Sequence, residues 1–250
     1  MKKRMLIVSV MAMAASLATA DVVSKNVVGY YTVKLNTPGY SMIGINFNSI
    51  GGTGIPIQDL FLPSSLYPGE GEWDVDNCDQ MIVWDNDMQD FLSFSYLDIG
   101  DGPKWYDAGY EKATIVLDPG MAFWFYRPSN NGEENVKIVG QVDEQATINR
   151  SFLPGYSMFS KSFPVEKLIG EEIEGYPGEY EWDLDNCDKL VIWDNETQDY
   201  RSYYYVDIGD GPGWYDEGYE PVSENFLVGM GAWYLYQGSG TLEWSENTPL

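Results

Sequence analysis

YPGEGEWDVDNCDQMIVWDNDMQDFLSFSYLDIGDGPKWYDAGY, at residues 67–110, returns as YPGEYEWDLDNCDKLVIWDNETQDYRSYYYVDIGDGPGWYDEGY at residues 176–219. The two segments align without a gap, and 29 of their 44 positions are identical. Self-similarity of this kind indicates a duplicated structural unit. Shorter matches lie on both sides, since 38–42 recurs as 154–158 and 120–124 resembles 229–233. We therefore expect two tandem repeats, over residues 21–150 and 151–250.

Composition favours an all-β fold, because 15% of the residues are aromatic and no long stripe of helical period is present. In each repeat a hairpin is expected, 80–84 with 91–97 and 189–193 with 200–206, turning at Asp-Asn. A last hairpin would pair 121–126 with 136–142, or 232–236 with 241–244. One short helical turn is expected at 56–60 and 164–168, with proline at its start. The prediction is two antiparallel β-sandwich or open-barrel repeats.

The first twenty residues have the pattern of a secretory signal peptide. Lys2, Lys3 and Arg4 precede an apolar stretch at 5–17 that is too short to span a bilayer comfortably. A small-residue cleavage site follows at 18–20, so cleavage is expected near Ala20. The mature protein would then be secreted or held at the cell surface, with the periplasm as a further destination. A short N-terminal membrane anchor is the alternative.

Charge and missing residue types exclude several functions. The chain has a net charge of −25, and loss of the signal segment would remove three cations and no acid. Such a charge repels nucleic acid and anionic membranes, so no nucleic-acid partner is expected. Histidine is absent, which excludes Ser-His-Asp and Cys-His catalysis and imidazole-bound zinc. No later segment has the length and hydropathy of a membrane span.

The two cysteines, Cys78 and Cys187, occupy the same position in the two repeats. Export would allow a disulfide between them, provided that both lie near the axis that relates the repeats. Two separately buried thiols are the preferred interpretation, because free cysteine is commonly buried as a small apolar group.

Acidic loops form the first candidate site. Carboxylate and amide oxygens within a few residues are ligands of the kind that Ca²⁺ takes. Turn formation, in which such side chains bond their own backbone, is the preferred alternative. The candidate calcium ligands are Asp74, Asp76, Asn77, Asp79, Asp98 and Asp101 in the first repeat and Asp183, Asp185, Asn186, Asp188, Asp207 and Asp210 in the second.

Loops rich in aromatic and acidic residues form the second candidate site. Flat rings beside carboxylates suit stacking on sugar faces and hydrogen bonding to hydroxyls. Packing in the core or in an interface is the preferred alternative. The candidate ligand-binding residues are Trp105, Tyr106, Asp107 and Tyr110, their counterparts Trp214, Tyr215, Asp216 and Tyr219, and Arg201, Tyr203 and Tyr205, which alternation places on one face of a strand.

These features favour an exported, acidic, non-catalytic protein that binds a glycan or another surface component, or that has a structural role, with calcium as a candidate stabiliser. A glycoside hydrolase that uses two carboxylates is the enzymatic alternative. Two equivalent repeats argue against a single asymmetric active site. The oligomeric state does not follow from the sequence.

Several short motifs resemble a group of exported bacterial proteins with tandem β-repeats and no established activity. The resemblance is carried by NVVGYYTV at 26–33, by PGYSM at 38–42 and 154–158, by strands ending in Trp-Asp at 83–85 and 192–194, and by PGMAFW at 119–124. It implies an exported β-repeat protein and assigns no site. The second repeat departs from it with Val228 in place of Pro119, and the acidic segment at 74–79 is not part of the pattern.

Overall fold

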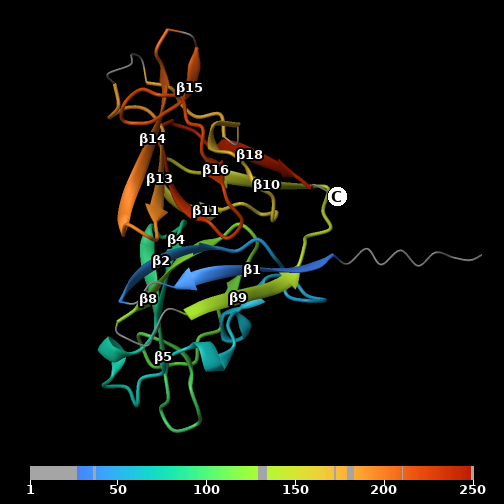
Figure 1. Cartoon of the computed structure of the whole chain (residues 1–250), viewed down its shortest axis with the longest axis vertical. Coiled ribbons are helices and arrows are strands. Elements are labelled where there is room, and N and C mark those ends of the chain that lie inside the picture. Colours follow the sequence, from blue (N-terminus) through green and yellow to red (C-terminus); the bar gives the residue numbers. More distant parts are fainter. Residues whose placement is uncertain are drawn as a thin grey trace, which may run out of the picture.

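The computed structural model describes residues 27–35, 38–128, 134–171, 173–178, 183–209 and 211–248. The expected signal peptide lies outside these residues, as does Asp210. Within them the fold is all-β, and the only helical elements are short 3-10 turns. Two similar halves follow one another along the longest axis of the molecule (Figure 1).

A five-stranded antiparallel sheet forms the centre of the first half, in the order β2-β8-β4-β5-β6. Two small sheets accompany it, β1 with β9 and β3 with β7. The elements are β1 (Val28–Leu35), β2 (Gly39–Gly44), β3 (Ile55–Pro56), η1 (Ile57–Asp59), η2 (Pro63–Ser65), η3 (Val75–Asn77), β4 (Gln80–Asp85), β5 (Asp90–Leu97), β6 (Lys104–Asp107), β7 (Val116–Leu117), β8 (Ala122–Arg127) and β9 (Glu134–Gln141).

The second half repeats this plan, with the sheet order β11-β17-β13-β14-β15 and the small sheets β10-β18 and β12-β16. Its elements are β10 (Thr147–Phe152), β11 (Gly155–Ser160), β12 (Lys167–Leu168), η4 (Ile169–Glu171), β13 (Lys189–Asp194), β14 (Asp199–Asp207), β15 (Pro212–Tyr215), β16 (Asn225–Phe226), β17 (Gly231–Tyr236) and β18 (Leu242–Asn247). The prediction of two similar all-β halves is confirmed.

Two details of the predicted topology are wrong. The last two strands of each half do not form a hairpin, because β8 pairs with β2 and β4 while β9 returns to pair with β1. Buried Val136 and Ile138 of β9 thereby cover the central sheet from the other side of the core. In the second half Leu168, rather than Pro164, occupies the place of Pro56, since each residue pairs in the equivalent small sheet.

Side-chain alternation gives each central sheet two different faces. On β4, Met81 and Val83 are buried in the main core of the first half together with residues of β1 and β9. Ile82 and Trp84 point to the opposite face, where they pack against a small cluster that includes residues of both halves. This opposite face is where the two halves meet.

The halves are joined by a reciprocal exchange of turns. The turn at 85–89 follows β4 and the turn at 194–198 follows β13, and we call these two segments the docking turns. Each docking turn bonds the edge strand of the other half. The bonds are Met158 N to Asn86 Oδ1 at 3.2 Å, Gln89 Nε2 to Tyr156 O at 2.9 Å, Met42 N to Asn195 Oδ1 at 3.1 Å and Gln198 Nε2 to Tyr40 O at 2.8 Å.

Gln89 and Gln198 adopt positive φ angles of 53° and 56°, which are uncommon for residues other than glycine. In each docking turn the aspartate at the start, Asp85 or Asp194, accepts backbone hydrogen bonds from the next residues and fixes the turn. The same unusual backbone in both copies therefore places the glutamine side chain against the opposite half.

A second set of contacts lies where the edge strands cross. Gly44 N donates to Gly229 O at 2.8 Å, and Ser160 N donates to Gly120 O at 2.7 Å. The guanidinium of Arg150 donates to Gly120 O at 2.6 Å and to Pro119 O at 2.9 Å. Burial lowers the pKa of Arg150 to about 10, so it stays charged at neutral pH. The halves thus share a buried, hydrogen-bonded interface.

Candidate functional site

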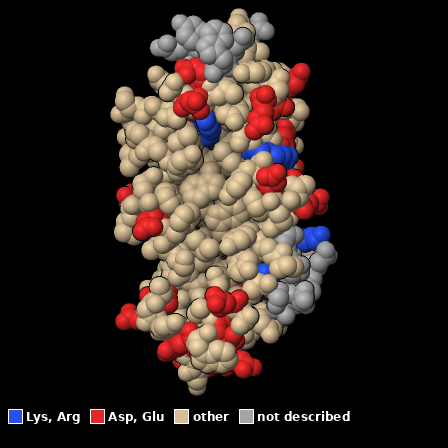
Figure 2. Space-filling model, turned by 90° about the vertical axis from the view of Figure 1, so that its left-hand side faces the viewer, with Lys and Arg blue, Asp and Glu red and all other residues tan. Residues whose placement is uncertain are grey.

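An aromatic groove runs across the junction of the two halves. We define it by eight rings, which are Tyr40, Trp84, Phe91 and Trp124 of the first half and Tyr156, Trp193, Tyr200 and Trp233 of the second. In the space-filling view an uncharged hollow lies at mid-height, with carboxylates gathered above and below it (Figure 2). The side chains that line the groove come from the sheet faces that point away from the two main cores.

The groove consists of two adjoining cavities. The first, of about 370 Å³, is lined by Trp84, Phe91, Tyr156, Val191, Tyr200 and Trp233. The second, of about 480 Å³, is lined by Tyr40, Ile82, Phe91, Ser93, Trp124, Trp193 and Tyr200. Phe91 and Tyr200 line both, so the two cavities adjoin. Both volumes lie within the range of small-molecule sites, roughly 300–1,000 Å³.

Strand register explains why the rings gather. Trp84 on β4 pairs with Phe91 on β5, and Trp193 on β13 pairs with Tyr200 on β14. Directly paired residues of antiparallel strands point to the same face, so each pair forms one wall. Their ring centroids lie 4.7 Å and 4.8 Å apart, in edge-to-face geometry.

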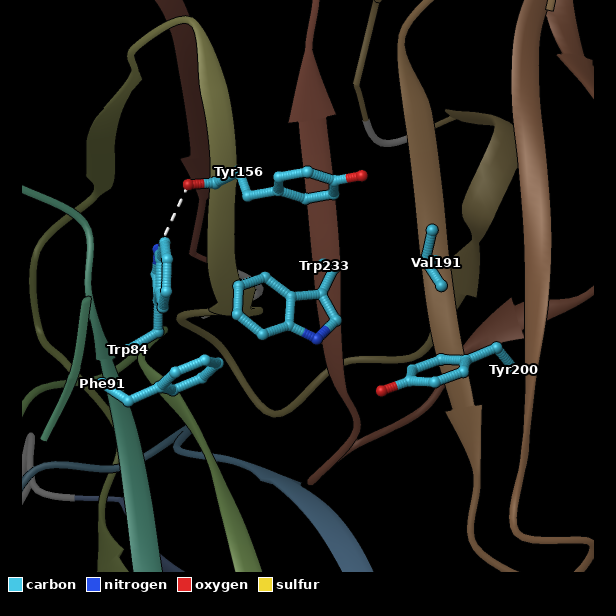
Figure 3. Close-up of a pocket in the computed structure, with 6 residues that line it drawn as sticks. All are labelled: Trp84, Phe91, Tyr156, Val191, Tyr200 and Trp233. Carbon is cyan, nitrogen blue, oxygen red and sulfur yellow. Dashed lines mark hydrogen bonds between the residues drawn. The ribbon is translucent and has the colours of Figure 1, made fainter. Parts of the chain in front are cut away.

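Each wall packs against a tryptophan of the other half, and this tryptophan forms the floor of the cavity. The centroids of Trp84 and Trp233 lie 5.3 Å apart, and those of Trp193 and Trp124 lie 5.1 Å apart. Figure 3 shows the indole of Trp233 at the centre of the first cavity, with Tyr156, Phe91 and Tyr200 around it. The site therefore exists only when the two halves are docked.

The tryptophans of the walls are held in place by the interface itself. Trp84 Nε1 donates to Tyr156 O at 3.2 Å, and Trp193 Nε1 donates to Tyr40 O at 3.2 Å (Figure 3 shows the first of these bonds). In contrast, Phe91 and Tyr200 are 48% and 50% exposed. The groove thus combines fixed indoles with ring faces that are open to solvent.

No charged side chain is among the described residues that line either cavity. The polar groups there are the hydroxyls of Ser93 and of the tyrosines and the indole N–H groups of the tryptophans. Burial raises the pKa of Tyr200, so its hydroxyl is neutral and can donate a hydrogen bond at physiological pH. The groove is suited to an uncharged ligand with apolar faces and polar edges.

The aromatic loops that the sequence suggested as a glycan platform lie elsewhere. Trp105 is 1% exposed and Trp214 is 4% exposed, and each packs in the main core of its half. Tyr106 and Tyr215 are buried as well. β6 and β15 are edge strands of the central sheets, and on them Trp105 and Trp214 face the main cores while Tyr106 and Tyr215 pack in the clusters of Cys78 and Cys187. These four rings therefore offer no exposed platform.

The polar residues of the same loops form turns. Asp107 Oδ1 accepts hydrogen bonds from the backbone of Gly109 and Glu111, and Asp216 Oδ1 accepts the corresponding bonds from Gly218 and Glu220. Tyr110 and Tyr219 remain exposed, with φ angles of 60° and 61°. They lie apart from the residues that line the groove.

Arg201, Tyr203 and Tyr205 share one face of β14, as predicted, but this face is opposite to that of Tyr200. Arg201 and the Tyr203 hydroxyl both donate to Glu224, and Arg201 also lies 3.6 Å from Asp194. Tyr205 packs against Trp214. These residues therefore lie on the core side of the sheet and do not join the groove.

The acidic loops are organised as turns around protein donors. Hydrogen bonds from Glu70 N and from Asn77 Nδ2 hold the pKa of Asp74 below its usual value. Asn186 Nδ2 donates to Asp183 in the same way, at 2.6 Å. Asp76 and Asp185 are exposed. Within the described ranges, which omit Asp210, no group of three or more His, Cys, Asp or Glu side chains is arranged to hold a metal ion.

The second acidic loop has the same character. Asp98 accepts from Gly100 N at 3.0 Å, and Asp207 accepts from Gly209 N at 2.8 Å. Asp101 receives the Lys104 ammonium and the Tyr106 hydroxyl, which lower the pKa of its carboxyl group. These contacts favour turn formation, the preferred alternative to calcium binding.

We accordingly expect calcium to raise the unfolding midpoint of the protein no more than magnesium does at equal ionic strength. The physical reason is that seven of the eleven described candidate residues already accept protein hydrogen bonds through a carboxylate oxygen. Thermal unfolding in excess calcium, in magnesium and in chelator measures this. A calcium-specific rise that Asp76→Asn or Asp185→Asn removes would contradict the prediction, because an ion bound to the native state stabilises it.

Asp79 and Asp188, the last acids of the two segments, are fully buried with different partners. Asp79 faces Arg127, whose Nε and Nη2 donate to its two oxygens at 2.8 Å and 2.5 Å. Asp188 faces no cation in the equivalent place. It accepts hydrogen bonds from the Tyr234 hydroxyl, Tyr176 N and Gln237 N. Burial raises the pKa of Asp188 above its usual value.

This raised pKa predicts a pH effect on stability. A carboxyl group whose pKa is higher in the folded state stabilises that state when protonated, and this contribution is lost as pH rises through the folded pKa. The free energy of unfolding of the wild type minus that of Asp188→Asn should therefore fall as pH rises from about 4, the ordinary pKa of an aspartate, towards neutrality. Urea unfolding of both proteins over this range measures the difference. A difference that rises with pH would refute the assignment.

The two cysteines are free and buried, and the disulfide that the sequence left open does not form. Cys78 packs with Leu97 and Tyr106, and Cys187 packs in a separate cluster of the second half. Burial raises the pKa of both thiols to about 11, so they are unreactive at neutral pH.

Comparison with protein-family models, with curated proteins and with solved structures finds no match. Of the residues that the structure describes, none belongs to a helix long and apolar enough to cross a bilayer.

The residues of the groove are not those that the loop motifs indicated. The sequence contained a signal for them, because the tryptophans Trp84 and Trp193 occupy the same position in the two repeats. Alternation along each strand also places them on the sheet face that points away from the core. No pattern in the sequence predicted that the two halves dock and that their sheet faces together form one groove.

Proposed function

We propose that the protein is an exported, non-catalytic binding protein and that the aromatic groove binds carbohydrate. The observation that carries this proposal is the combination of exposed rings, such as Phe91 and Tyr200, with hydroxyls and without charged groups in a preformed cavity. Sugars have apolar C–H faces that stack on rings and hydroxyl edges that form hydrogen bonds. Aromatic residues with a polar end supply both kinds of contact.

The groove supports binding over hydrolysis. A glycoside hydrolase needs two carboxyl groups on either side of the bond that it cleaves, at about 5–9.5 Å from each other. No carboxylate is among the described lining residues of the two cavities. The acids nearest in sequence to the wall tryptophans, Asp85 and Asp194, accept backbone hydrogen bonds within the docking turns. Their bonds give them a structural role.

A fixed site also favours binding. The indoles of Trp84 and Trp193 are hydrogen-bonded across the interface, so little side-chain freedom is lost when a ligand arrives. The expected location outside the cytoplasm, which depends on the signal peptide, agrees with a surface or extracellular polysaccharide as partner.

The proposal predicts that the protein is retained on an insoluble neutral polysaccharide and that Phe91→Ala together with Tyr200→Ala abolishes retention. Each ring is half-exposed, so its removal should leave the fold intact, while each lost stacking contact should cost more than about 1 kcal/mol of binding. Co-sedimentation with insoluble cellulose, with circular dichroism as a check on folding, measures both effects.

Tyr30→Ala is the matched control, since Tyr30 is an exposed ring on β1 and does not line the groove. The control should bind like the wild type. A wild type that no neutral polysaccharide retains, or a double variant that binds as strongly as the wild type, would contradict the proposal.

A further inference from the structure

The two cavities of the groove are copies of one another. Phe91 and Tyr200 occupy the same position in the two repeats, as do Trp84 and Trp193. Three further pairs correspond in the same way, Tyr156 with Tyr40, Trp233 with Trp124 and Val191 with Ile82, while Ser93 lines the second cavity alone. Each cavity takes its wall from one half and its floor from the other. The groove therefore contains two nearly equivalent subsites related by the pseudo-twofold axis.

These subsites adjoin at two shared rings. Phe91 and Tyr200 border both cavities, and their rings contact the floors on the two sides. The centroid of Phe91 lies 6.1 Å from that of Trp233, and the centroid of Tyr200 lies 6.2 Å from that of Trp124. No charged residue is among the described residues that line either subsite. One molecule can thus occupy both subsites.

Charge restricts the ligand further. The described lining is uncharged, while the chain as a whole has 39 acidic and 14 basic residues. Carboxylates border the hollow on the face that Figure 2 shows. A uronic-acid or sulfated polymer would be repelled from this groove, because like charges raise the free energy of approach. A neutral chain meets no such barrier.

We propose that the groove binds a single chain of a neutral, linear, β-1,4-linked polysaccharide across both subsites. This inference rests on the proposed function and specifies its substrate class. A β-1,4-linked chain is an extended ribbon whose successive sugar rings present flat faces, and it can contact rings in two adjoining cavities at once. Aromatic stacking has little dependence on chain direction, so two subsites of opposite orientation can serve one chain.

Binding across two subsites makes affinity depend on chain length. When both subsites engage one molecule, the second contact is intramolecular and total affinity rises by about 10²–10⁴-fold over a single contact. A disaccharide would instead fill the subsites independently. The comparison of cellobiose with cellohexaose by isothermal titration calorimetry should show at least about a hundredfold tighter binding of the hexamer, at one hexamer per protein chain.

Tyr40→Ala and Tyr156→Ala are matched variants, because each tyrosine lines one subsite alone. The hydrogen bonds of Tyr40 N and O and of Tyr156 O to the other half are made by backbone atoms, which substitution leaves in place. Each variant should lose most of the advantage of cellohexaose over cellobiose. Each should also lower the number of cellobiose molecules bound per chain from two to one.

The outcomes separate this inference from the proposed function. Binding of two cellohexaose molecules per chain, with the affinity of cellobiose, would overturn the single-chain inference and leave carbohydrate binding standing. Binding confined to an acidic chain such as hexagalacturonate, or to neutral chains of another linkage, would overturn the substrate class. Absence of binding to every neutral polysaccharide would overturn the proposed function itself.

Discussion

Replacing Asp79 by asparagine is expected to lower the free energy of unfolding by about 3–5 kcal/mol. Asp79 is 0% exposed, and its carboxylate is bound by the guanidinium of Arg127, which is buried as well. Asparagine keeps the shape of the side chain but leaves the positive charge of Arg127 buried without a counter-charge. An amide NH₂ would also face guanidinium donors. Urea unfolding at neutral pH measures the loss.

Asp188→Asn is the matched control, because Asp188 is the counterpart of Asp79 and binds no cation. Its substitution at neutral pH weakens hydrogen bonds but also removes a carboxylate whose charge burial disfavours, so a loss of no more than about 1 kcal/mol is expected. Arg127→Met combined with Asp79→Asn removes the unpaired charge and should recover much of the stability that Asp79→Asn loses. Equal losses for Asp79→Asn and Asp188→Asn would show that the arginine does not distinguish the two sites.

Gly120→Ala is expected to lower the free energy of unfolding by roughly 3 kcal/mol or more, from left-handed strain of about 1–2 kcal/mol and overpacking of about 1–3 kcal/mol. Gly120 has a φ of 90°, and a Cβ atom there would lie 0.8 Å from Nη2 of Arg150. Arg150 cannot move aside freely, because it is hydrogen-bonded to Pro119 O, Ser160 O and Ser162 Oγ. The substitution should also weaken docking of the halves, which thermal unfolding and glycan binding both report.

Gly51→Ala separates backbone strain from crowding. Gly51 also has a positive φ, of 75°, but no atom lies within 4 Å of the position of its Cβ. Only the strain of about 1–2 kcal/mol is expected there. If Gly120→Ala and Gly51→Ala lowered the free energy of unfolding by the same amount, the close contact between Gly120 and Arg150 would not be important for the interface.

Much of the fold could be predicted from the sequence. The repeat at 67–110 and 176–219 gave the duplication, and alternation with the Asp-Asn turns gave the hairpins β4–β5 and β13–β14 within a residue or two. Strand pairing distant in sequence was harder. The pairing of β9 with β1 is decided by tertiary burial of Val136 and Ile138, which local patterns do not encode.

The same distinction between local pattern and long-range contact applies to the site. A cluster of Trp, Tyr and Asp in a loop has the composition of a sugar platform, yet Trp105 and Trp214 are drawn into the cores because their rings bury the most area there. The rings of the groove come instead from the sheet faces that point away from the main cores. Only the docking of two halves makes those faces a groove, and docking depends on three-dimensional contacts such as those of Asn86 and Asn195.

The reciprocal docking turns have a consequence for the history of the chain. Two copies of one surface that contact each other through the same residues are an isologous pair, the arrangement found in twofold symmetric homodimers. Here both partners lie on one polypeptide, so each can change without the other. Leu92, Phe94 and Ile115 in one partner correspond to Arg201, Tyr203 and Glu224 in the other. Two repeats on one polypeptide can acquire an asymmetry that two identical subunits cannot evolve.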